Sequence, residues 1–440
     1  MANIAHLYSE HLEQLVARHR QLMLENQLDY LLIPSGVPVG IYLDDMNYPF
    51  KSSFLFRTYL PLTEVADSYL LLGLNDKPTL IYYQPVDFWH SPAKDPDGFW
   101  PEHFDIKIIT EFEQAKEFFP TDSNKVAILG EETRLTQSFE KAQRNPKPLL
   151  NAIYWQRAYK SEYEIECLSR ANQKATKAHK AAELAFRQGK SEQQIHLAYL
   201  NACGDMEHQM PYSNIVALNQ HSAILHYTEC ESTRPQNPQS FLLDAGVSVN
   251  GYHSDITRSY AFKGNEFSAL IDAMDKMQLA CIDSIQVNQD YLDLHIQAHL
   301  SIAQILKDFD LVDMSAQAML EQGISGTFFP HGLGHLIGLQ VHDVGGQFAD
   351  ASGQANPPPA AHAFLRSTRK MENDMVFTIE PGLYFIPSLL DKQRQSAHSK
   401  AFNWDKIEQM IPFGGIRIED NIVIHEDGVR NLTREAFAKL

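Results

Sequence analysis

Two aspartates in one short β-rich stretch are the first residues of this sequence whose types and spacing suggest chemistry. Asp244 and Asp255 lie in FLLDAGVSVNGYHSDITRSYAF at 241–262. An Asn-Gly pair between two β-rich runs predicts a hairpin with a type I′ turn at Asn250-Gly251. In that register Asp244 pairs with Thr257, and Asp244 and Asp255 share one face one diagonal step apart, with roughly 7–8 Å between their backbones. Such a pair can hold one or two divalent metal ions. The alternative is a solvated hairpin face that carries surface aspartates.

A glycine-rich stretch supplies candidate histidine ligands. The segment FPHGLGHLIGLQVHD at 329–343 contains three histidines and three glycines. His331 and His335 are four residues apart, a spacing that would place them on one face of a helix. Each glycine costs a helix about 1 kcal/mol, so the segment instead predicts a loop whose backbone approaches a ligand closely. We expect His335 and His342 to project from this loop.

Two further stretches place glutamates in apolar strands. The segment VFTIEPGLYF at 376–385 predicts a strand that ends in Glu380 before a Pro-Gly turn. In FGGIRIEDNIVI at 413–424, alternation along a strand places Arg417 and Glu419 on the same face. Acidic residues are seldom buried unless they are paired or bind a metal. Taken singly, a glutamate before Pro-Gly is ordinarily a turn residue, and a histidine among glycines is ordinarily structural.

Four carboxylates and one imidazole from these stretches form an oxygen-rich ligand set. Such a set suits Mn²⁺, Co²⁺ or Zn²⁺ in a two-metal site, with the ions about 3.5–4 Å apart. Four negative ligands balance two divalent ions, and without metal they would repel one another strongly. The expected ligands, in chain order, are Asp244, Asp255, His335, Glu380 and Glu419.

The composition describes a globular protein with more than one core. A chain of 440 residues is long for a single domain, and 44% hydrophobic and 21% charged residues are typical of folded proteins. The net charge of −18, from 55 acidic and 37 basic residues, disfavours nucleic acids and anionic membranes as partners. The four cysteines form no Cys-x-x-Cys pair, and no apolar run resembles a signal peptide or a membrane span. We therefore expect a cytoplasmic protein with reduced thiols.

Helical and strand-like patterns divide the chain near residue 155. Residues 1–155 predict a complete α/β domain, and residues 156–440 predict a second domain with long helices around the two aspartates. After residue 308 the pattern predicts strands and loops, including a Pro-rich loop at 354–362. The expected helices span 4–26, 159–189, 191–206, 266–288 and 291–308, and the expected strands span 30–33, 69–72, 79–83, 106–109, 126–129, 215–218 and 223–227.

The ligand stretches resemble a known family. The pita-bread metallopeptidases have motifs similar to LLDAGVSVNGYHSDITRSY, FPHGLGHLIGLQVHDVGG, FTIEPGLYF and GGIRIEDNIVI. Within that family the sequence resembles the bacterial Xaa-Pro dipeptidases (prolidases) and the related organophosphorus acid anhydrolases. The segment RAYKSEYEIECLSRAN at 157–172 is similar to the start of the family's catalytic domain. The resemblance extends over nearly the whole chain through LDDMNYPF at 43–50 and PVDFWH at 85–90.

The resemblance implies a fold and a cofactor. Residues 1–155 would form a creatinase-N-like α/β domain that takes part in dimer contacts. Residues 156–440 would form an α+β pita-bread domain with a curved antiparallel sheet. The family's metal ligands fall on the same five residues, and two divalent ions are implied, with Mn²⁺ favoured over Co²⁺ or Zn²⁺.

The resemblance also implies positions that contact the substrate. In a homodimer, Asp45 and Trp89 of one subunit would close the pocket of the other. Strand parity places His253 on the ligand face, but the family has no ligand there, so we expect it to lie behind the ligands or to face solvent. The remaining implied substrate positions are Tyr212, His226, His331, His342 and Arg417.

The implied reaction is hydrolysis of Xaa-Pro dipeptides. Glu380 would act as general base and then general acid, and His331 and His342 would stabilise the oxyanion or the leaving nitrogen. Arg417 with neighbouring histidines would hold the proline carboxylate. Organophosphorus triesters and fluorophosphates are expected as substrates of a side activity. The alternatives are an aminopeptidase P acting on longer peptides, a creatinase-like amidinohydrolase and a non-catalytic pita-bread binding protein, and the complete ligand set disfavours the last two.

Overall fold

The chain forms two compact units. The structure is a computed structural model that describes residues 3–89, 91 and 93–440. His90, the last residue of the PVDFWH stretch, therefore lies outside the described residues. The N-terminal unit comprises residues 1–157, 161–166 and 350–354, and the C-terminal unit comprises residues 158–160, 167–349 and 355–440.

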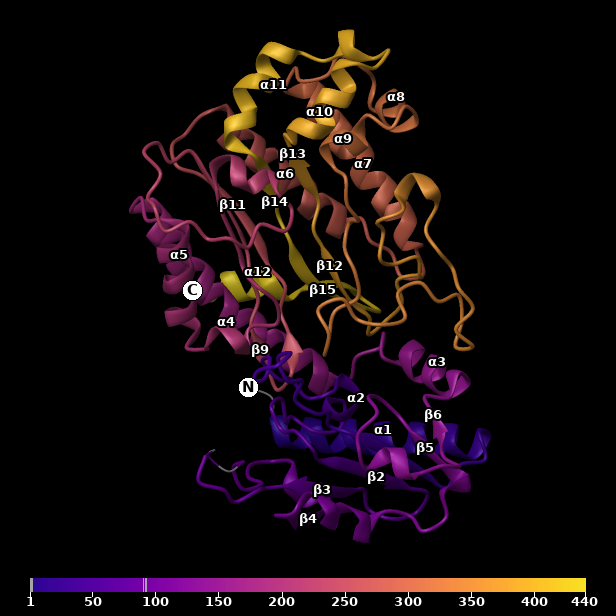
Figure 1. Cartoon of the computed structure of the whole chain (residues 1–440). Coiled ribbons are helices and arrows are strands. Elements are labelled where there is room, and N and C mark those ends of the chain that lie inside the picture. Colours follow the sequence, from indigo (N-terminus) through magenta and orange to yellow (C-terminus); the bar gives the residue numbers. More distant parts are fainter. Residues whose placement is uncertain (1–2, 90, 92) are drawn as a thin grey trace. The chain divides into compact units, whose positions relative to one another are not determined.

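A mixed six-stranded sheet forms the centre of the N-terminal unit (Figure 1). Its strands are β1 (Tyr30–Pro34), β2 (Tyr69–Gly73), β3 (Thr79–Tyr83), β4 (Asp105–Ile109), β5 (Val126–Ile128) and β6 (Gln143–Arg144), and its helices include α1 (Ile4–Glu25), α2 (Phe54–Arg57) and α3 (Lys147–Gln156). The sheet order is β4-β3-β2-β1-β5-β6. β2 and β3 form an antiparallel hairpin, and β1 pairs antiparallel with β2 and parallel with β5, so the sheet combines a hairpin with crossover connections. Leu32, Ile81 and Val126 are buried in its core.

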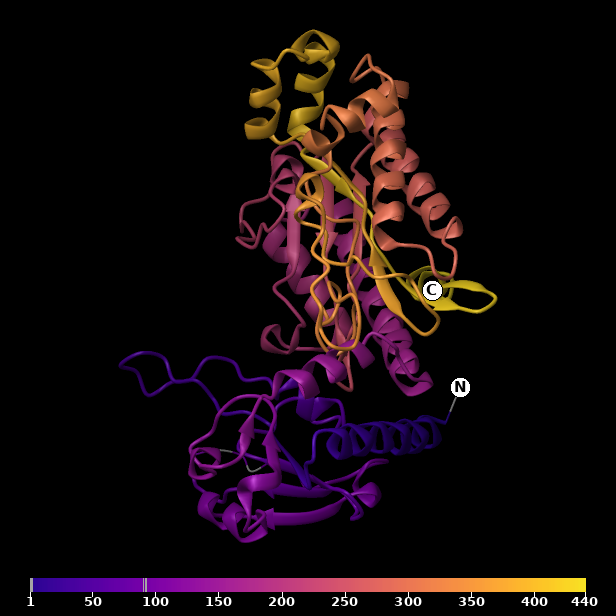
Figure 2. The same cartoon turned by 90° about the vertical axis from the view of Figure 1, so that its right-hand side faces the viewer.

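The C-terminal unit is built from short sheets and long helices (Figures 1 and 2). Its strands are β7 (Ile215–Leu218), β8 (Ser240–Asp244), β9 (Ser248–Val249), β10 (Tyr252–His253), β11 (Thr257–Ala261), β12 (Val376–Ile379), β13 (Gly382–Tyr384), β14 (Gly415–Arg417), β15 (Asp420–His425) and β16 (Gly428–Asn431). Its helices are α4 (Glu162–Arg187), whose residues up to Glu166 belong to the N-terminal unit, α5 (Glu192–Cys203), α6 (Glu266–Asp283), α7 (Tyr291–Asp308), α8 (Ala316–Glu321), α9 (Ser325–Phe328), α10 (Pro387–Arg394), α11 (Trp404–Met410) and α12 (Leu432–Phe437). The antiparallel sheets have the orders β11-β8-β7, β12-β15-β16, β13-β14 and β10-β9.

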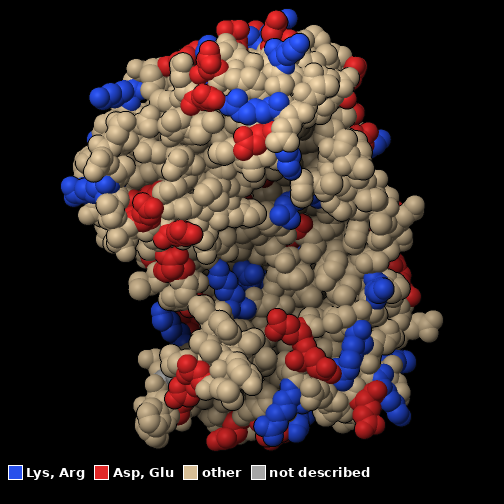
Figure 3. All heavy atoms as spheres, turned by 45° about the horizontal axis from the view of Figure 1, so that its top comes forward, with Lys and Arg blue, Asp and Glu red and all other residues tan. Residues whose placement is uncertain are grey.

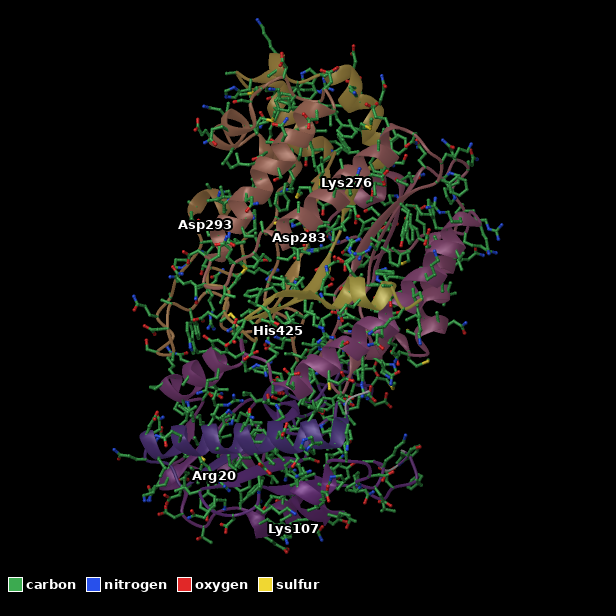
Figure 4. The ribbon with its side chains drawn as sticks, turned by 180° about the vertical axis from the view of Figure 1, so that it is seen from behind. Arg20, Lys107, Lys276, Asp283, Asp293 and His425 are labelled. Atoms are coloured by element: carbon green, nitrogen blue, oxygen red, sulfur yellow. The ribbon has the colours of Figure 1, made fainter. Side chains whose placement is uncertain are left out.

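Alternation along the strands separates a helix-covered face from an opposite face. Phe241 and Leu243 of β8 pack in one core with α4 and α5, whereas Leu242 packs with Tyr384 on the other side. Asp244 has the parity of Leu242 and so lies on the face away from α4 and α5. Figure 4, the view from behind, shows α6 and α7 lying across the strands. The apolar sides of the helices thus cover one face of the sheets, and polar side chains such as Asp244 lie on the opposite face.

Charged side chains of both signs lie on the surface. Lys276, Asp283 and Asp293, labelled in Figure 4, are exposed on α6 and α7. On the face in Figure 3, lysines and arginines are scattered among acidic side chains, and no basic stripe crosses that face. Among the described residues, no helix combines the length and the apolar character that crossing a membrane requires.

Some sequence-based elements were wrong. Residues 223–227 form no strand, because the chain leaves β7 through a 3₁₀ turn at Asn219–Ala223, where Asn219 has a φ of 55°. The region after residue 308, expected as strands and loops, also contains the short helices α8 to α12. Ser315, Asn403 and Asn431 cap three of these helices by accepting hydrogen bonds from backbone N–H groups. Helices of this length depend on tertiary packing, so their sequence pattern is weak.

Candidate metal centre

The hairpin around Asn250-Gly251 has the expected register. Both turn residues have positive φ, 52° and 86°, as a type I′ turn requires. Tyr252 pairs with Val249, and Thr257 pairs with Asp244. Because Ile256 packs against α4 and α5, its neighbour Asp255 points to the opposite face, where Asp244 also lies.

Tyr212 joins the two aspartates. Its hydroxyl lies 2.8 Å from Asp244 Oδ1 and also contacts Asp255 Oδ1. Asp255 is 5% exposed, so its carboxylate lies in the interior of the site. The two aspartates of the hairpin therefore converge on one point in space.

The glycine-rich segment lies beside β12 and holds His335. The His335 N–H donates to Thr378 Oγ1, and the Thr378 N–H donates to the His335 carbonyl oxygen at 2.9 Å. His335 Nδ1 lies 3.0 Å from the Leu336 carbonyl oxygen and so must carry the proton. Nε2 then faces the carboxylates, 3.5 Å from Asp255 Oδ2 and 3.6 Å from Glu380 Oε1. This orientation is the one that a metal-binding imidazole needs.

The two glutamates enter from the adjoining strands. Glu380 follows β12, and its N–H donates to the Leu333 carbonyl oxygen. Glu419 lies between β14 and β15 and forms a bridge to Thr257, whose hydroxyl donates to Glu419 Oε2 at 2.7 Å. Ligand atoms of Asp255, His335 and Glu419 lie within 4.8 Å of one another, and all three residues are buried. The structure thus brings together residues from all four sequence stretches.

The electrostatics of this cluster fit bound cations. Burial raises the pKa of Glu419 well above its usual value, and the charges of Asp255 and Glu380 raise it further. Burial likewise raises the pKa of Glu380 to about 7, and it raises the pKa of Asp244 despite the opposing charge of Arg417. The protein alone therefore disfavours ionisation of Glu419, Glu380 and Asp244, whereas hydrogen bonds from His335 and Tyr212 outweigh burial and lower the pKa of Asp255. Two divalent ions would supply the missing positive charge, and the oxygen-rich donors suit them.

Three histidines surround the cluster with different hydrogen bonds. His331 Nδ1 lies 2.8 Å from the Gly332 carbonyl oxygen, and its Nε2 lies 3.0 Å from the Tyr384 hydroxyl, so both nitrogens are engaged. The His342 ring packs edge-on against His335, with centroids 4.4 Å apart. Desolvation lowers the pKa of His331 and of His342 to about 3 in each case, and His226 contributes to both shifts. The imidazoles of His331 and His342 are therefore neutral near pH 7.

Arg417 is buried inside the cluster. Its Nη2 lies 2.5 Å from Asp244 Oδ2, its Nη1 lies 2.8 Å from the Tyr384 hydroxyl, and its Nε donates to Thr257 Oγ1. The guanidinium therefore neutralises and orients the carboxylate of Asp244, one of the expected ligands.

Family models match both parts of this chain. The model described as "Xaa-Pro dipeptidase, N-terminal domain" matches residues 6–155, and the model of metallopeptidase family M24 matches residues 166–426. The second match covers more than half of the chain and contains all five expected ligands. The chain belongs to metallopeptidase family M24. It is therefore a hydrolase, and its family implies a centre of divalent metal ions.

Full-length relatives and solved structures agree with this membership. The metallopeptidase is 48% identical over 435 residues to a Xaa-Pro dipeptidase of Shewanella oneidensis and 47% identical to one of Shewanella denitrificans, with 99% of each chain covered. Its fold is that of Zn-substituted aminopeptidase P of E. coli, with a TM-score of 0.74, 22% identity and 97% of each chain covered. An aminopeptidase of Pseudomonas aeruginosa has a TM-score of 0.73 at 19% identity, covering 97% of this chain and 98% of that one. The pita-bread fold predicted from the sequence is thus confirmed.

Two features of the metallopeptidase site were missed from the sequence. Tyr384 links His331 to Arg417 through its hydroxyl. Asn421 accepts the Asp255 N–H and donates to the Asp255 carbonyl oxygen at 2.7 Å. Asn172 of α4 donates to Asn421 in turn. The signal available in the sequence was Asn421, which lies two residues after Glu419 in an apolar strand. Asn seldom lies on such a strand without a hydrogen-bond partner.

The remaining predicted residues are Asp45, Trp89 and His253. Asp45 and Trp89 belong to the N-terminal unit and are exposed, Trp89 by 77%. His253 is buried, and its Nδ1 lies 2.7 Å from Ser248 Oγ while its N–H donates to the Gly338 carbonyl oxygen. His253 thus links the hairpin to the glycine-rich segment.

Replacing Gly334 with alanine is expected to dislocate His335. A Cβ at Gly334 would collide with the Thr378 carbonyl oxygen and lie 2.5 Å from the Tyr291 hydroxyl. The segment would have to move away from β12, at a cost of about 2 kcal/mol in the free energy of unfolding, as for other overpacked cores. Urea unfolding and metal content together measure both effects.

Gly326→Ala is the matched control for this substitution. A Cβ at Gly326, in α9, meets no atom within 4 Å, so the control should be neutral or slightly stabilising. If Gly334→Ala kept wild-type stability and metal content, the glycine-rich segment would not position His335 in the way we describe.

Proposed function

We propose that this metallopeptidase hydrolyses Xaa-Pro dipeptides at a dinuclear metal centre. One observation carries the proposal: the four stretches converge on a single carboxylate-rich cluster in a family of metallopeptidases. The names of its full-length relatives support the substrate class, since they are 46–48% identical over nearly the whole chain. The proposed ligands are Asp244, Asp255, His335, Glu380 and Glu419.

The donor set favours Mn²⁺, with Co²⁺ or Zn²⁺ as alternatives, because four of its five members are carboxylates. When bound, two such ions would polarise the scissile carbonyl and lower the pKa of water toward neutrality. Metal-free protein reconstituted with each ion should be most active with Mn²⁺.

Glu380 is the proposed general base and acid. It lies between His331 and His335, with its Oε2 3.9 Å from His331 Nδ1 and its Oε1 3.6 Å from His335 Nε2. A carboxylate in this position would take the proton of the attacking water and return it to the proline nitrogen. That nitrogen must be protonated as it leaves, because an Xaa-Pro bond yields a secondary amine.

His342 and His226 are the proposed groups that contact the substrate's polar atoms. Both lack a hydrogen bond to the protein within the described chain, and both are exposed. As neutral imidazole, His342 can donate its N–H to the oxyanion without a competing partner. The polar atoms of His331 and Arg417 already form hydrogen bonds within the protein. We therefore favour positioning roles for both, His331 through Tyr384 and Arg417 through Asp244, over direct binding of the proline carboxylate. Tyr212 would act in the same way, by orienting both aspartates.

Substrate length tests this proposal against aminopeptidase P. A dipeptidase should cleave Leu-Pro and leave Leu-Pro-Pro nearly intact, because the site must close on both charged ends of a dipeptide. Leu-Ala serves as the control for the proline requirement. Activity on Leu-Pro-Pro without activity on Leu-Pro would overturn the choice of a dipeptidase.

Organophosphorus esters are the proposed substrates of a side activity. A tetrahedral phosphorus centre resembles the intermediate of peptide hydrolysis, so the same cluster should bind it. The measurement is release of fluoride from a fluorophosphate, or of p-nitrophenol from a triester, by the Mn²⁺-loaded protein. Rates equal to those of the metal-free protein would exclude this activity.

We also propose a homodimer in which Asp45 and Trp89 reach the partner's pocket. Their exposure, together with that of Tyr42, Leu43 and Phe88, supports a surface that another subunit covers. Trp89→Ala should raise KM for Leu-Pro, with little effect on the metal content. A chain that sediments as an active monomer would exclude this arrangement. A cytoplasmic location stays a prediction.

A further inference from the structure

A second cluster of metal-binding side chains lies apart from the five proposed ligands. His295 and His299 are four residues apart on α7 and therefore share one face of the helix. Both are buried, whereas Asp293, labelled in Figure 4, lies on the exposed side of α7. His362, which ends a short 3₁₀ turn at Ala360–His362, meets them from the loop at 355–369. Nitrogen atoms of the three histidines lie within 4.8 Å of one another. We propose that this three-histidine cluster is a separate mononuclear Zn²⁺ site.

The spacing of the three rings agrees with a single bound ion. The ring centroid of His295 lies 4.6 Å from the centroid of His299 and 4.6 Å from that of His362. The centroids of His299 and His362 are 5.1 Å apart. His295 Nε2 lies 3.0 Å from His362 Nδ1. Tetrahedral Zn²⁺ with Zn–N bonds of about 2.0–2.1 Å requires nitrogens roughly 3.3 Å apart and ring centroids roughly 5 Å apart. Small rotations of the imidazoles would therefore admit the ion.

Hydrogen bonding leaves suitable nitrogens in the cluster. His299 Nδ1 is bonded to Ser325 Oγ at 3.0 Å, which orients the ring and leaves Nε2 for a metal. His295 Nδ1 is buried and has no hydrogen-bond partner in the described part of the chain, and its Nε2 forms a hydrogen bond with His362 Nδ1 that a bound ion would replace. Burial keeps the imidazoles neutral, since it lowers the pKa of His295 to about 2 and that of His299 to about 4. Metal ions bind the neutral form, so no proton competes near pH 7.

The donor types distinguish this cluster from the carboxylate-rich centre. Three imidazoles without a carboxylate among them favour Zn²⁺ over Mn²⁺, whereas the five-ligand cluster is rich in oxygen. The Phe329 ring contacts both His299 and His331, with centroid distances of 4.7 and 4.8 Å, and neither cluster shares a proposed ligand with the other. An ion at the three-histidine cluster would thus have a coordination sphere of its own.

A bound ion would fix a loop that lies against the glycine-rich segment. The loop carrying His362 continues to Leu365, whose Cα is 3.1 Å from the position of a Cβ at Gly332. His331 directly precedes that glycine. Zinc would therefore tie the loop to α7 and hold the segment that carries His331, which gives the site a structural role beside the reaction centre.

Zinc stoichiometry of the full chain tests this inference. His362→Gln removes one donor at the half-exposed edge of the cluster, and His425→Gln, a half-exposed histidine in Figure 4, is the matched control. After chelation and equilibrium dialysis against Zn²⁺, the His362→Gln protein should bind one equivalent per chain fewer than the wild type and the control. Equal binding by all three would overturn the proposal.

A chain with an impaired carboxylate cluster isolates the new site. Asp255→Asn combined with Glu419→Gln should still bind one equivalent of Zn²⁺, and adding His362→Gln should remove it. Loss of all zinc from the double variant would also overturn the proposal. With Co²⁺, the double variant should show the strong visible absorption of four-coordinate cobalt with imidazole ligands. These measurements use no substrate, so their outcome is independent of the peptidase assignment.

Discussion

Asp255→Asn should lower kcat/KM for Leu-Pro by far more than about 100-fold, beyond the 10–100-fold typical of groups that only support metal ligands. Asp255 is 5% exposed, lies 3.5 Å from His335 Nε2 and shares the Tyr212 hydroxyl with Asp244. Asparagine has nearly the same shape, so the hairpin and its backbone bonds to Asn421 should persist. The substitution removes a negative charge from the centre of the cluster, and bound metal should fall with activity.

Kinetics and metal analysis on the same preparation check this result. Asp283→Asn, an exposed substitution on α6 visible in Figure 4, is the control and should behave like the wild type. If Asp255→Asn kept more than about a tenth of the wild-type rate, the ligand assignment would be wrong. Loss of a metal ligand lowers the rate by more than loss of a residue that only supports a ligand.

Metal-free protein should lose stability as the pH rises from about 4.5 to about 7. Burial raises the pKa of Glu380 to about 7 in the folded chain, above its ordinary value of 4.5. At low pH this group is protonated in both the folded and unfolded states, so folding is not opposed. As the pH rises, the unfolded chain ionises first, and the folded state loses about 3 kcal/mol from Glu380 by linkage. Glu419, Asp244 and His335 also have raised pKa values and act in the same direction.

Urea unfolding at pH 5 and pH 8, with and without Mn²⁺, measures this effect. The metal-loaded protein should show the opposite trend, because the ion binds deprotonated ligands. Glu380→Gln cannot ionise, so in the metal-free state its stability should change less between the two pH values. A metal-free wild type that is equally stable at both values would show that the carboxylates do not repel one another as we infer.

Short-range rules explain the parts of the site that the sequence predicted. The Asn250-Gly251 turn determines the hairpin register within a few residues, and alternation then directs Asp244 and Asp255 to one face. The same alternation predicted that Arg417 and Glu419 lie on one face of their strand. Glycines in the His335 segment excluded a helix. These rules act over a few residues, so no knowledge of the fold was needed to apply them.

Contacts between distant segments could not be predicted in the same way. Arg417 lies 173 positions from Asp244, and alternation says which face a guanidinium occupies but not which carboxylate it meets. The resemblance implied a substrate-binding arginine, and only the fold shows that its guanidinium is buried against Asp244. The Asn421–Asn172 bond spans 249 positions and is equally invisible to local patterns.

The sequence by itself determined which carboxylates and imidazoles are candidate metal ligands, which strand faces Asp244 and Asp255 occupy and where the hairpin turns. The tertiary structure decided how the four stretches converge, because packing of the helices against one side of the sheets leaves the other side as the meeting point. It also decided that His362 joins His295 across 67 positions, since only the folded loop brings that imidazole to α7. Local periodicity specifies the direction in which a side chain points, and long-range packing specifies which residues that side chain contacts.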